Sequence, residues 1–247
     1  MKRNNETKAA IHLSLQGKGG VGKSLVASIL AQYFIHRGTA IRCIDTDPVN
    51  QTFAQYKRLP VERVKLIRDG GIDQRGFDAL METLLTSEGV FVVDNGASTF
   101  VPLWNYFLEN NTLELLRNSG RRVYVHSIVT GGQAMDDTLE GFRQLAETTT
   151  DQMFVVWINE YFGRVEWQGK GFLDMAVYRD NEQKILGSVA IPKRNQDTFG
   201  RDVEEMISRK QTFDEAVESD STLIMAKQRL RVIQRELFRQ LDVIPLV

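Results

Sequence analysis

Short apolar runs alternate along this chain with longer stretches in which apolar residues recur every three or four positions. The short runs are typical of strands buried on both faces, and the longer stretches are typical of helices that cover a parallel sheet. The pattern predicts strands near residues 10–16, 40–45, 63–68, 89–94, 122–129, 153–158 and 184–190. It predicts helices over residues 23–37, 50–57, 74–86, 101–118, 133–147, 197–209 and 212–240. We therefore expect an α/β fold, with a mostly parallel sheet flanked by helices.

Composition narrows the class of protein without identifying a function. The chain has 247 residues, of which 42% are hydrophobic and 26% charged, as in an ordinary globular protein. Neither a repeat nor a linker rich in Pro, Gly or Ser interrupts it, so one domain over residues 1–247 is expected, with a flexible tail at residues 1–8. The formal net charge of −1 gives no global attraction to nucleic acid or anionic lipid, so such binding would need a local patch.

Cysteine content and hydropathy argue against a disulfide-bonded, an iron–sulfur, a membrane-spanning or a secreted protein. The single cysteine, Cys43, cannot form an internal disulfide, and it cannot supply an iron–sulfur cluster even across a dimer. No apolar run approaches the roughly 18 residues that a membrane-spanning helix needs, and the first residues lack the apolar core of a signal peptide. A cytoplasmic protein is therefore expected.

The segment between the first predicted strand and the first predicted helix carries the most specific motif. It reads Gly17-Lys18-Gly19-Gly20-Val21-Gly22-Lys23-Ser24 and matches the phosphate-binding loop G-x-x-x-x-G-K-[ST]. Glycines let backbone N–H groups turn inward around phosphate oxygens, where a Cβ would obstruct them. Lys23 would reach the β- and γ-phosphates as a point charge, and Ser24 would offer its hydroxyl to Mg²⁺. The helix N-terminus would add partial positive charge under the phosphates.

Polar residues follow four of the predicted strands, at the edge of a parallel sheet where ligands bind. They are Asp45-Thr46-Asp47-Pro48, Asp94-Asn95-Gly96-Ala97, Asn159-Glu160 and Ile191-Pro192-Lys193-Arg194-Asn195. Asp94 ends an apolar run in the manner of a Walker B motif, so it is expected to hold Mg²⁺, usually through water. Gly96 would let a backbone N–H approach the γ-phosphate and sense its loss. Taken alone, Asp94 could instead cap a helix, and Asp47-Pro48 could be a simple turn.

Lys18, the first lysine of the loop, is the basis of a resemblance to a known protein family. Residues 18–24 resemble the deviant Walker A motif of the ParA/MinD ATPases, P-loop NTPases of the SIMIBI type. The resemblance implies that two subunits dimerise around ATP and that Lys18 of each completes the other's site, in the way of an arginine finger supplied in trans. It also implies that Asp47 positions the attacking water and that Asp45 lies near the water shell of the metal. The alternative for Lys18 is a solvated loop lysine.

This chain departs from the family's pattern in two places. Val49 stands in place of the usual glutamine in the first switch, and Asn95-Gly96 follow Asp94 where the family often has prolines. In the second half of the chain, Asn159 matches the family's base-contacting asparagine, whose amide both donates and accepts hydrogen bonds. Pro192 lies in a segment that resembles the family's Ile-Pro-Arg segment, which packs along the base. The Asn-Lys-x-Asp motif of guanine-specific proteins does not occur in the sequence, so ATP is expected rather than GTP.

Three stretches, residues 11–20, 45–50 and 157–163, are similar to the TraL-type proteins, ParA-like ATPases encoded with plasmid conjugation genes. This similarity implies a homodimer that forms with ATP, hydrolyses it slowly as a switch, and acts with conjugation or DNA-processing proteins. The cofactors implied are ATP and Mg²⁺.

Other functions remain open on the same fold. A partitioning ATPase would bind nonspecific DNA through basic residues, unless these form only a solvated face. The candidates are Lys193, Arg194, Arg201, Arg209 and Lys210. A MinD-like membrane switch would use an apolar stripe on the last helix, but that stripe is expected to dock onto the body of the protein instead. The stripe comprises Leu230, Ile233, Leu237 and Leu241. An amide synthase or ligase would need an added substrate cleft.

Overall fold

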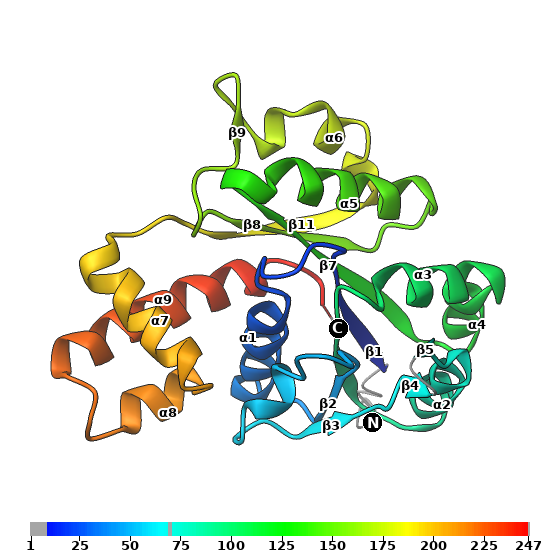
Figure 1. Ribbon diagram of the computed structural model, residues 1–247, viewed down its shortest axis with the longest axis horizontal. Coiled ribbons are helices and arrows are strands. Elements are labelled where there is room, and N and C mark those ends of the chain that lie inside the picture. Colours follow the sequence, from blue (N-terminus) through cyan, green and yellow to red (C-terminus); the bar gives the residue numbers. More distant parts are fainter. Residues whose placement is uncertain (1–8, 69–70, 247) are drawn as a thin grey trace, which may run out of the picture.

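The computed structural model describes residues 9–68 and 71–246, so the tail expected at residues 1–8 lies outside the described residues. A seven-stranded sheet forms the centre of the molecule, in the order β11-β8-β7-β1-β6-β2-β3, and every neighbouring pair is parallel (Figure 1). Its strands are β1 (Ala10–Leu15), β2 (Ile41–Asp45), β3 (Val61–Arg63), β6 (Val90–Asp94), β7 (Arg122–Thr130), β8 (Phe154–Asn159) and β11 (Ile185–Ile191). The predicted α/β class and its parallel sheet are confirmed.

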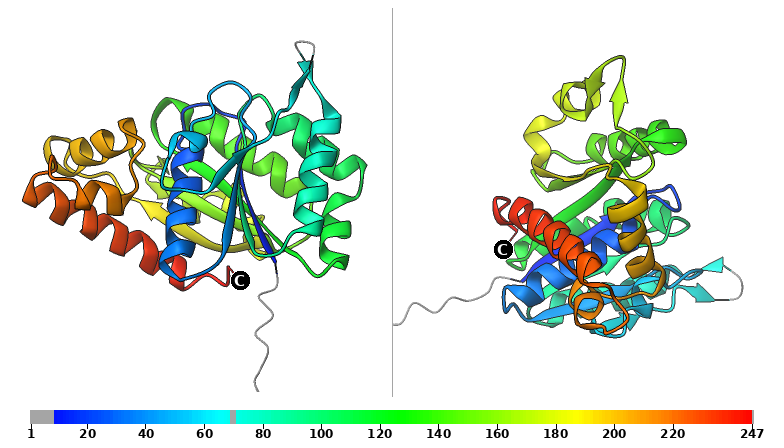
Figure 2. Two further views of the ribbon diagram at one scale, coloured as in Figure 1. Left: turned by 90° about the horizontal axis from the view of Figure 1, so that it is seen from below. Right: turned by 90° about the vertical axis from the view of Figure 1, so that its left-hand side faces the viewer.

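Helices cover both faces of this sheet (Figure 2). They are α1 (Lys23–His36), α2 (Gln74–Thr86), α3 (Phe100–Glu109), α4 (Thr112–Asn118), α5 (Met135–Glu147), α6 (Ala176–Arg179), α7 (Arg201–Ser208), α8 (Phe213–Glu218) and α9 (Ile224–Asp242). Two apolar cores result, because successive strand residues point to opposite faces. One core joins the sheet to α1, α7, α8 and α9, and the other joins it to α2, α3, α4 and α5.

The last helix docks onto the body as the sequence indicates. Leu230, Ile233, Leu237 and Leu241 are all buried. They pack in the core that α1 shares with the sheet. None of the helices in the described ranges has the length and apolarity that crossing a bilayer requires.

Three predicted helices are wrong in extent because side chains or turns take the backbone N–H groups that a helix would use. Residues 50–57 contain only a 3₁₀ turn at Phe53–Gln55. Residues 101–118 are split into α3 and α4 at Asn111, whose φ of 52° is left-handed. Residues 212–240 are split into α8 and α9, and between them Ser221 N donates to Ser219 Oγ.

The third strand is also displaced from its prediction at residues 63–68. In β3, Val61 pairs with Cys43 and the chain leaves the sheet after Arg63. Among the described strands, β3 has a neighbour on one side only, so its hydrophobic pattern constrains the register weakly. Two small hairpins were not predicted, since strands of two residues are too short to show alternation. They are β4 (Ile67–Arg68) with β5 (Gly71–Ile72), and β9 (Glu166–Trp167) with β10 (Lys170–Gly171).

Three buried polar side chains on neighbouring strands form a row of hydrogen bonds on the face of the sheet that α1 covers. Trp157 Nε1 donates to His126 Nδ1 at 3.0 Å, and His126 Nε2 lies 3.0 Å from His12 Nδ1. Because His126 Nδ1 accepts from tryptophan, its Nε2 carries the proton and donates to His12. Burial lowers the pKa of His12 to about 3 and the pKa of His126 well below its usual value. Both imidazoles are therefore neutral in the folded protein at neutral pH.

This pair predicts a pH dependence of stability. Well above pH 6.5 the two histidines are neutral in both the folded and the unfolded protein, so their contribution to the free energy of unfolding is fully present. Below that pH the unfolded chain takes up protons that the folded protein cannot, so stability is lost as pH falls. We expect the free energy of unfolding to fall by about 4 kcal/mol more between pH 7 and pH 5 in the wild type than in a His12→Phe/His126→Leu variant. Urea unfolding at each pH measures the difference, in which other titrations cancel, and parallel profiles would contradict it.

Candidate functional site

The loop of residues 17–24 joins β1 to α1 at the carboxyl edge of the sheet. Gly20 and Gly22 have φ of 75° and 105°, a region that other residues rarely adopt, so glycine is required at both positions. Gly22 is the residue before the first turn of α1, whose free N–H groups face the loop. Lys23 is buried, and its Nζ donates to the carbonyl of Lys18 at 2.8 Å. The loop thus curls around a lysine ammonium group at a helix N-terminus, the arrangement that binds phosphate.

Asp94 ends β6 directly beside this loop. Burial raises the pKa of Asp94 to about 7, an effect that a hydrogen bond from Ser24 and the charge of Lys23 partly oppose. Burial lowers the pKa of Lys23, while the charges of Asp94 and Asp47 act against that shift. One oxygen of Asp94, Oδ1, is buried and has no hydrogen-bond partner among the residues that the structure describes. A buried, unsatisfied carboxylate oxygen is costly, and a cation beside Ser24 would satisfy it.

These residues fit Mg²⁺ better than a metal held by protein alone. Within residues 9–68 and 71–246, no three His, Cys, Asp or Glu side chains come together to hold a metal. Mg²⁺ is commonly bound by one or two protein groups, with phosphate oxygens and water as its other ligands. Ser24 and Asp94 suit that mode of binding. Asp45 has a different visible role, because its two oxygens accept the N–H groups of Asp47 and Ala54, each at 2.9 Å.

The two predicted switch elements lie in contact. A Cβ built on Gly96 would stand 2.7 Å from Cγ of Asp47, so only glycine allows this approach. Thr46 joins the same elements, since its N–H and its hydroxyl both donate to the carbonyl of Asp94 at 2.9 Å. Asp47 Oδ1 also accepts the N–H groups of Val49 and Asn50, at 2.9 and 3.2 Å. The loop after β2 and the loop after β6 are therefore coupled at the edge of the phosphate-binding loop.

Gln16 is a site residue that the sequence reasoning missed. It is fully buried, and its Nε2 donates to the carbonyls of Ile128 at 2.9 Å and Thr138 at 3.0 Å. Its Oε1 accepts the N–H of Gly17, the first residue of the loop, at 2.8 Å. A Cβ on Gly141 of α5 would overlap this amide. A glycine inside a predicted helix was the available signal, because such a glycine often marks close packing.

Lys18, the lysine expected to act in trans, is held within its own chain. Its Nζ lies 2.6 Å from Asp137 Oδ2, near the beginning of α5, and both side chains are about half exposed. An exposed ion pair of this kind contributes about 0–1 kcal/mol, so it is easily exchanged for another partner.

The residues predicted to contact the base do not share one role. The amide of Asn159 donates from Nδ2 to the carbonyl of Val21 at 3.0 Å and accepts the N–H of Tyr161 at 3.1 Å. It therefore braces the phosphate-binding loop in this structure. Pro192 is exposed, and it lines an apolar pocket together with Tyr161 and Leu25.

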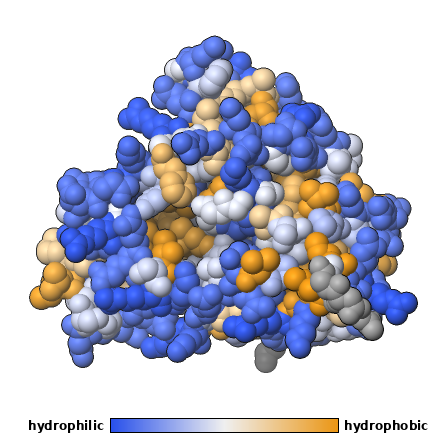
Figure 3. Space-filling model, viewed as in Figure 1, coloured by the Kyte–Doolittle hydropathy of each residue, from blue (hydrophilic) through white to orange (hydrophobic). Residues whose placement is uncertain are grey.

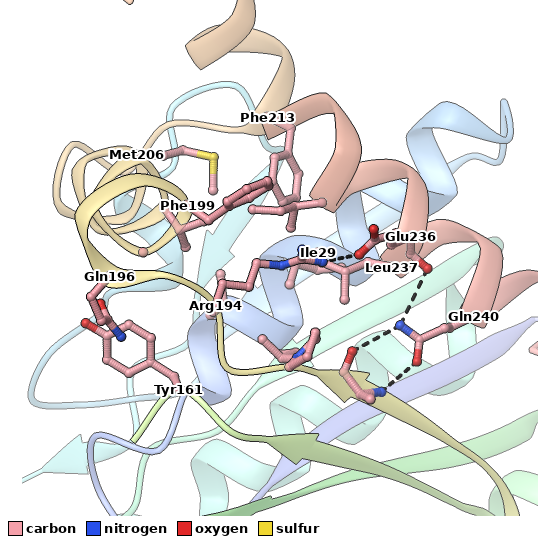
Figure 4. A pocket seen from close by; sticks show the side chains of 17 residues that line it. Ile29, Tyr161, Arg194, Gln196, Phe199, Met206, Phe213, Glu236, Leu237 and Gln240 are labelled. Atoms are coloured by element: carbon pink, nitrogen blue, oxygen red, sulfur yellow. Dashed lines mark hydrogen bonds and ion pairs between the residues drawn. The ribbon is translucent and has the colours of Figure 1, made fainter. Parts of the chain in front are cut away.

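This pocket lies between α1 and the α7–α9 region, where Figure 3 shows hydrophobic side chains in a hollow left of centre. Figure 4 shows Phe199, Met206 and Phe213 on one side of it and the ion pair between Arg194 and Glu236 across it. Its volume of about 60 Å³ has room for a few water molecules.

Comparison with known proteins gives one consistent result. The model of the CobQ/CobB/MinD/ParA nucleotide binding domain matches residues 14–224. Two proteins named Protein TraL from Escherichia coli are 46% and 45% identical over 235 residues, covering 95% of this chain and 98% of theirs. Among solved structures, the MinD cell division protein of Aquifex aeolicus aligns with a TM-score of 0.53 and 16% identity, over 94% of this chain and 97% of that one. A ParA family ATPase from Chlorobium tepidum aligns with a TM-score of 0.51 and 12% identity, over 91% and 97%.

Proposed function

Because this chain belongs to the CobQ/CobB/MinD/ParA nucleotide-binding family, we propose that it is a switch that binds Mg-ATP, closes into a dimer around the nucleotide and hydrolyses ATP slowly. The observation that carries the proposal is the meeting of Lys23, Ser24 and the unsatisfied oxygen of Asp94 at the ends of β1 and β6. These groups supply what a triphosphate with its cation requires, namely a positive charge, a hydroxyl and a carboxylate.

The proposed roles of the residues follow from their positions. Lys23 leaves the carbonyl of Lys18 and binds the β- and γ-phosphates, while Ser24 and Asp94 hold the cation. When bound, Mg²⁺ neutralises charge that develops on the transferred phosphoryl group. Asp47 orients the attacking water, and its contact with Gly96 lets one loop respond to the other when the γ-phosphate is lost. The adenine base lies at the carboxyl ends of β8 and β11, against Pro192.

The biological setting proposed is plasmid conjugative transfer, with the dimer acting as an accessory factor for DNA-processing or transfer proteins. This part rests on the near full-length similarity to the two proteins named Protein TraL. Of the basic residues considered for DNA binding, Arg194 and Arg209 form ion pairs within the chain, with Glu236 and Glu205. They are therefore less available for phosphate contacts.

Asp47→Ala tests the switch directly. We expect this variant to bind ATP and to accumulate as a dimer, because the nucleotide stays intact when the attacking water is no longer oriented. Light scattering with Mg-ATP and with Mg-ADP, each with and without nonspecific duplex DNA, measures the mass. A dimer with ATP alone that retains DNA would favour a DNA-positioning role, and a dimer indifferent to DNA would favour a protein partner. A constant monomer, or rapid turnover in this variant, would refute the mechanism.

Lys18→Ala tests the action of this lysine in trans. We expect the variant to bind nucleotide as a monomer with unchanged affinity and to lose ATP-driven dimerisation, since Lys18 is exposed and lies outside the buried Lys23–Asp94 pair. Asp137→Asn is the matched variant: it releases Lys18 from its partner in the same chain and should keep or strengthen dimerisation. Sedimentation velocity with Mg-ATP compares the two, and an unchanged dimer in Lys18→Ala would leave Lys18 as a solvated loop residue.

A further inference from the structure

A second pocket opens at the edge of the sheet opposite the phosphate-binding loop. Its walls come from residues at or just before the beginnings of three neighbouring strands, β7, β8 and β11, and from α4. Strand beginnings and strand ends lie at opposite edges of a parallel sheet, so this pocket is remote from Lys23 and Asp94. Its volume is about 350 Å³, which suits a small organic molecule. We call it the amino-edge pocket.

Arginines predominate among the charged side chains of the amino-edge pocket. Arg117, Arg121 and Arg122 line it, together with one carboxylate, Asp151. Arg117 Nη1 lies 2.7 Å from Asp151 Oδ1, so these two charges balance each other. Arg122 also takes part in an interaction within the chain. The remaining cation of the wall is Arg121.

The guanidinium group of Arg121 makes fewer hydrogen bonds than its burial requires. Its Nη2 donates to the carbonyl of Leu85 at 2.6 Å. Its Nε and Nη1 are buried and have no hydrogen-bond partner within residues 9–68 and 71–246. Burial lowers the pKa of Arg121 from its usual value, but a guanidinium group stays protonated at neutral pH. Buried N–H groups of a cation are costly to leave unpaired, and an oxyanion beside them would offset that cost.

The rest of the pocket wall is mainly apolar. It is formed by Leu113, Val123, Tyr124, Met153, Leu186 and Pro245. An inorganic ion bound to Arg121 would leave these side chains in contact with water, whereas an apolar group attached to the anion would cover them. The wall therefore suits a ligand that combines an oxyanion with an apolar or aromatic body.

We propose that the amino-edge pocket binds a small organic anion, with its phosphate or carboxylate group against Arg121 and its apolar body against Val123 and Leu186. Guanidinium groups bind both kinds of oxyanion through charge-assisted hydrogen bonds. The side chain of Arg121 lines the pocket and is only partly buried, so a change in its outer torsion angles brings Nε and Nη1 to the ligand.

Titration of the full-length protein with model anions tests this proposal, which is independent of the proposed ATP switch. The probes are phenyl phosphate and benzoate, with benzyl alcohol as the neutral analogue and inorganic phosphate as the anion without an apolar body. We expect both aromatic anions to shift the Nε–H resonance of Arg121 in NMR spectra and to bind at least about tenfold more tightly than either control. The tighter of the two identifies the preferred oxyanion. Saturating Mg-ADP should leave these affinities unchanged, because the phosphate-binding loop lies at the other edge of the sheet.

Three variants locate the binding. Arg121→Met removes the guanidinium group, should weaken phenyl phosphate binding at least about tenfold, and assigns the Nε–H resonance by its loss. Gln152→Trp places a large side chain at the exposed rim of the pocket without changing the charge, and should also weaken binding. Arg75→Met is the matched control, since it removes an exposed arginine from the first turn of α2, and it should leave the affinity within about twofold.

Unchanged affinity in Arg121→Met would overturn the assignment, and so would an equal loss in Arg75→Met. Displacement of phenyl phosphate by Mg-ADP would place the anion in the phosphate-binding loop and overturn it too. Inorganic phosphate that binds as tightly as phenyl phosphate would contradict the role of the apolar wall. Urea unfolding checks that each variant is folded.

Discussion

Lys23→Ala is expected to weaken nucleotide binding by at least about a hundredfold, the largest effect on function that we predict. Hydrogen bonds to charged groups contribute about 1.5–3 kcal/mol each, and Lys23 is placed to make more than one with phosphate oxygens. The loss is larger here because the charges of Asp94 and Asp47 act on this position. Without the ammonium group, these carboxylates would repel the triphosphate.

Titration calorimetry with a slowly hydrolysed ATP analogue and Mg²⁺ measures this loss. Lys170→Ala is the matched control, since Lys170 is exposed in β10 and its replacement removes the same charge. It should leave the affinity within about threefold, as expected for a solvated side chain. Affinity in Lys23→Ala close to that of the wild type would place the triphosphate elsewhere.

Gly141→Ala is expected to lower the free energy of unfolding by about 3 kcal/mol. In an ordinary helix this change would raise the free energy of unfolding by up to about 1 kcal/mol, because alanine has a higher helix propensity than glycine. Here the new methyl group would overlap the amide of Gln16, which is fully buried. Displacing that amide leaves the carbonyls of Ile128 and Thr138 and the N–H of Gly17 without their partner. Each orphaned buried group costs about 1–3 kcal/mol.

A double-mutant cycle separates this mechanism from general damage to α5. Gln16→Ala removes the amide and makes room for the methyl group, so the double variant should be more stable than the sum of the single effects predicts, by at least about 1 kcal/mol. Gly171→Ala, where a Cβ meets no atom within 4 Å, should stay within about 0.5 kcal/mol of the wild type. Strictly additive effects in urea unfolding would refute the proposed contact between Gln16 and Gly141.

The parallel sheet could be predicted because buried strands carry their own signal. Apolar runs such as Val90–Asp94 and Phe154–Asn159 lie within a residue or two of their predicted bounds. The hydrophobic pattern is less informative at the ends of strands and at the edges of the sheet, where the apolar run is short or one face of the strand is exposed. Thus β3 begins and ends earlier than predicted, and the helix expected at residues 50–57 is replaced by a loop whose N–H groups bind Asp45 and Asp47.

The candidate site was predictable in its chemistry but not in its internal contacts. The motif of residues 17–24 and the carboxylates after β2 and β6 were recognisable, because parallel strands bring their carboxyl ends to one edge. Three contacts were not: the pairing of Lys18 with Asp137, the bracing of the loop by Asn159, and the approach of Gln16 to Gly141. Each joins residues more than 100 positions apart in the sequence, so local pattern carries no information about it.

By itself the sequence determined the type of sheet, the phosphate-binding loop and the set of polar groups at its edge, because these follow from local periodicity and from residues adjacent in the chain. Only the tertiary structure decided which of those polar groups already form hydrogen bonds within the chain and which are available to a ligand. Asp45 and Asn159 are occupied by backbone N–H and carbonyl groups, whereas Asp94 keeps an unsatisfied oxygen. The physical reason is that hydrogen bonding and burial depend on what the fold brings within about 3 Å, and the distant segments meet only after the helices pack on the sheet.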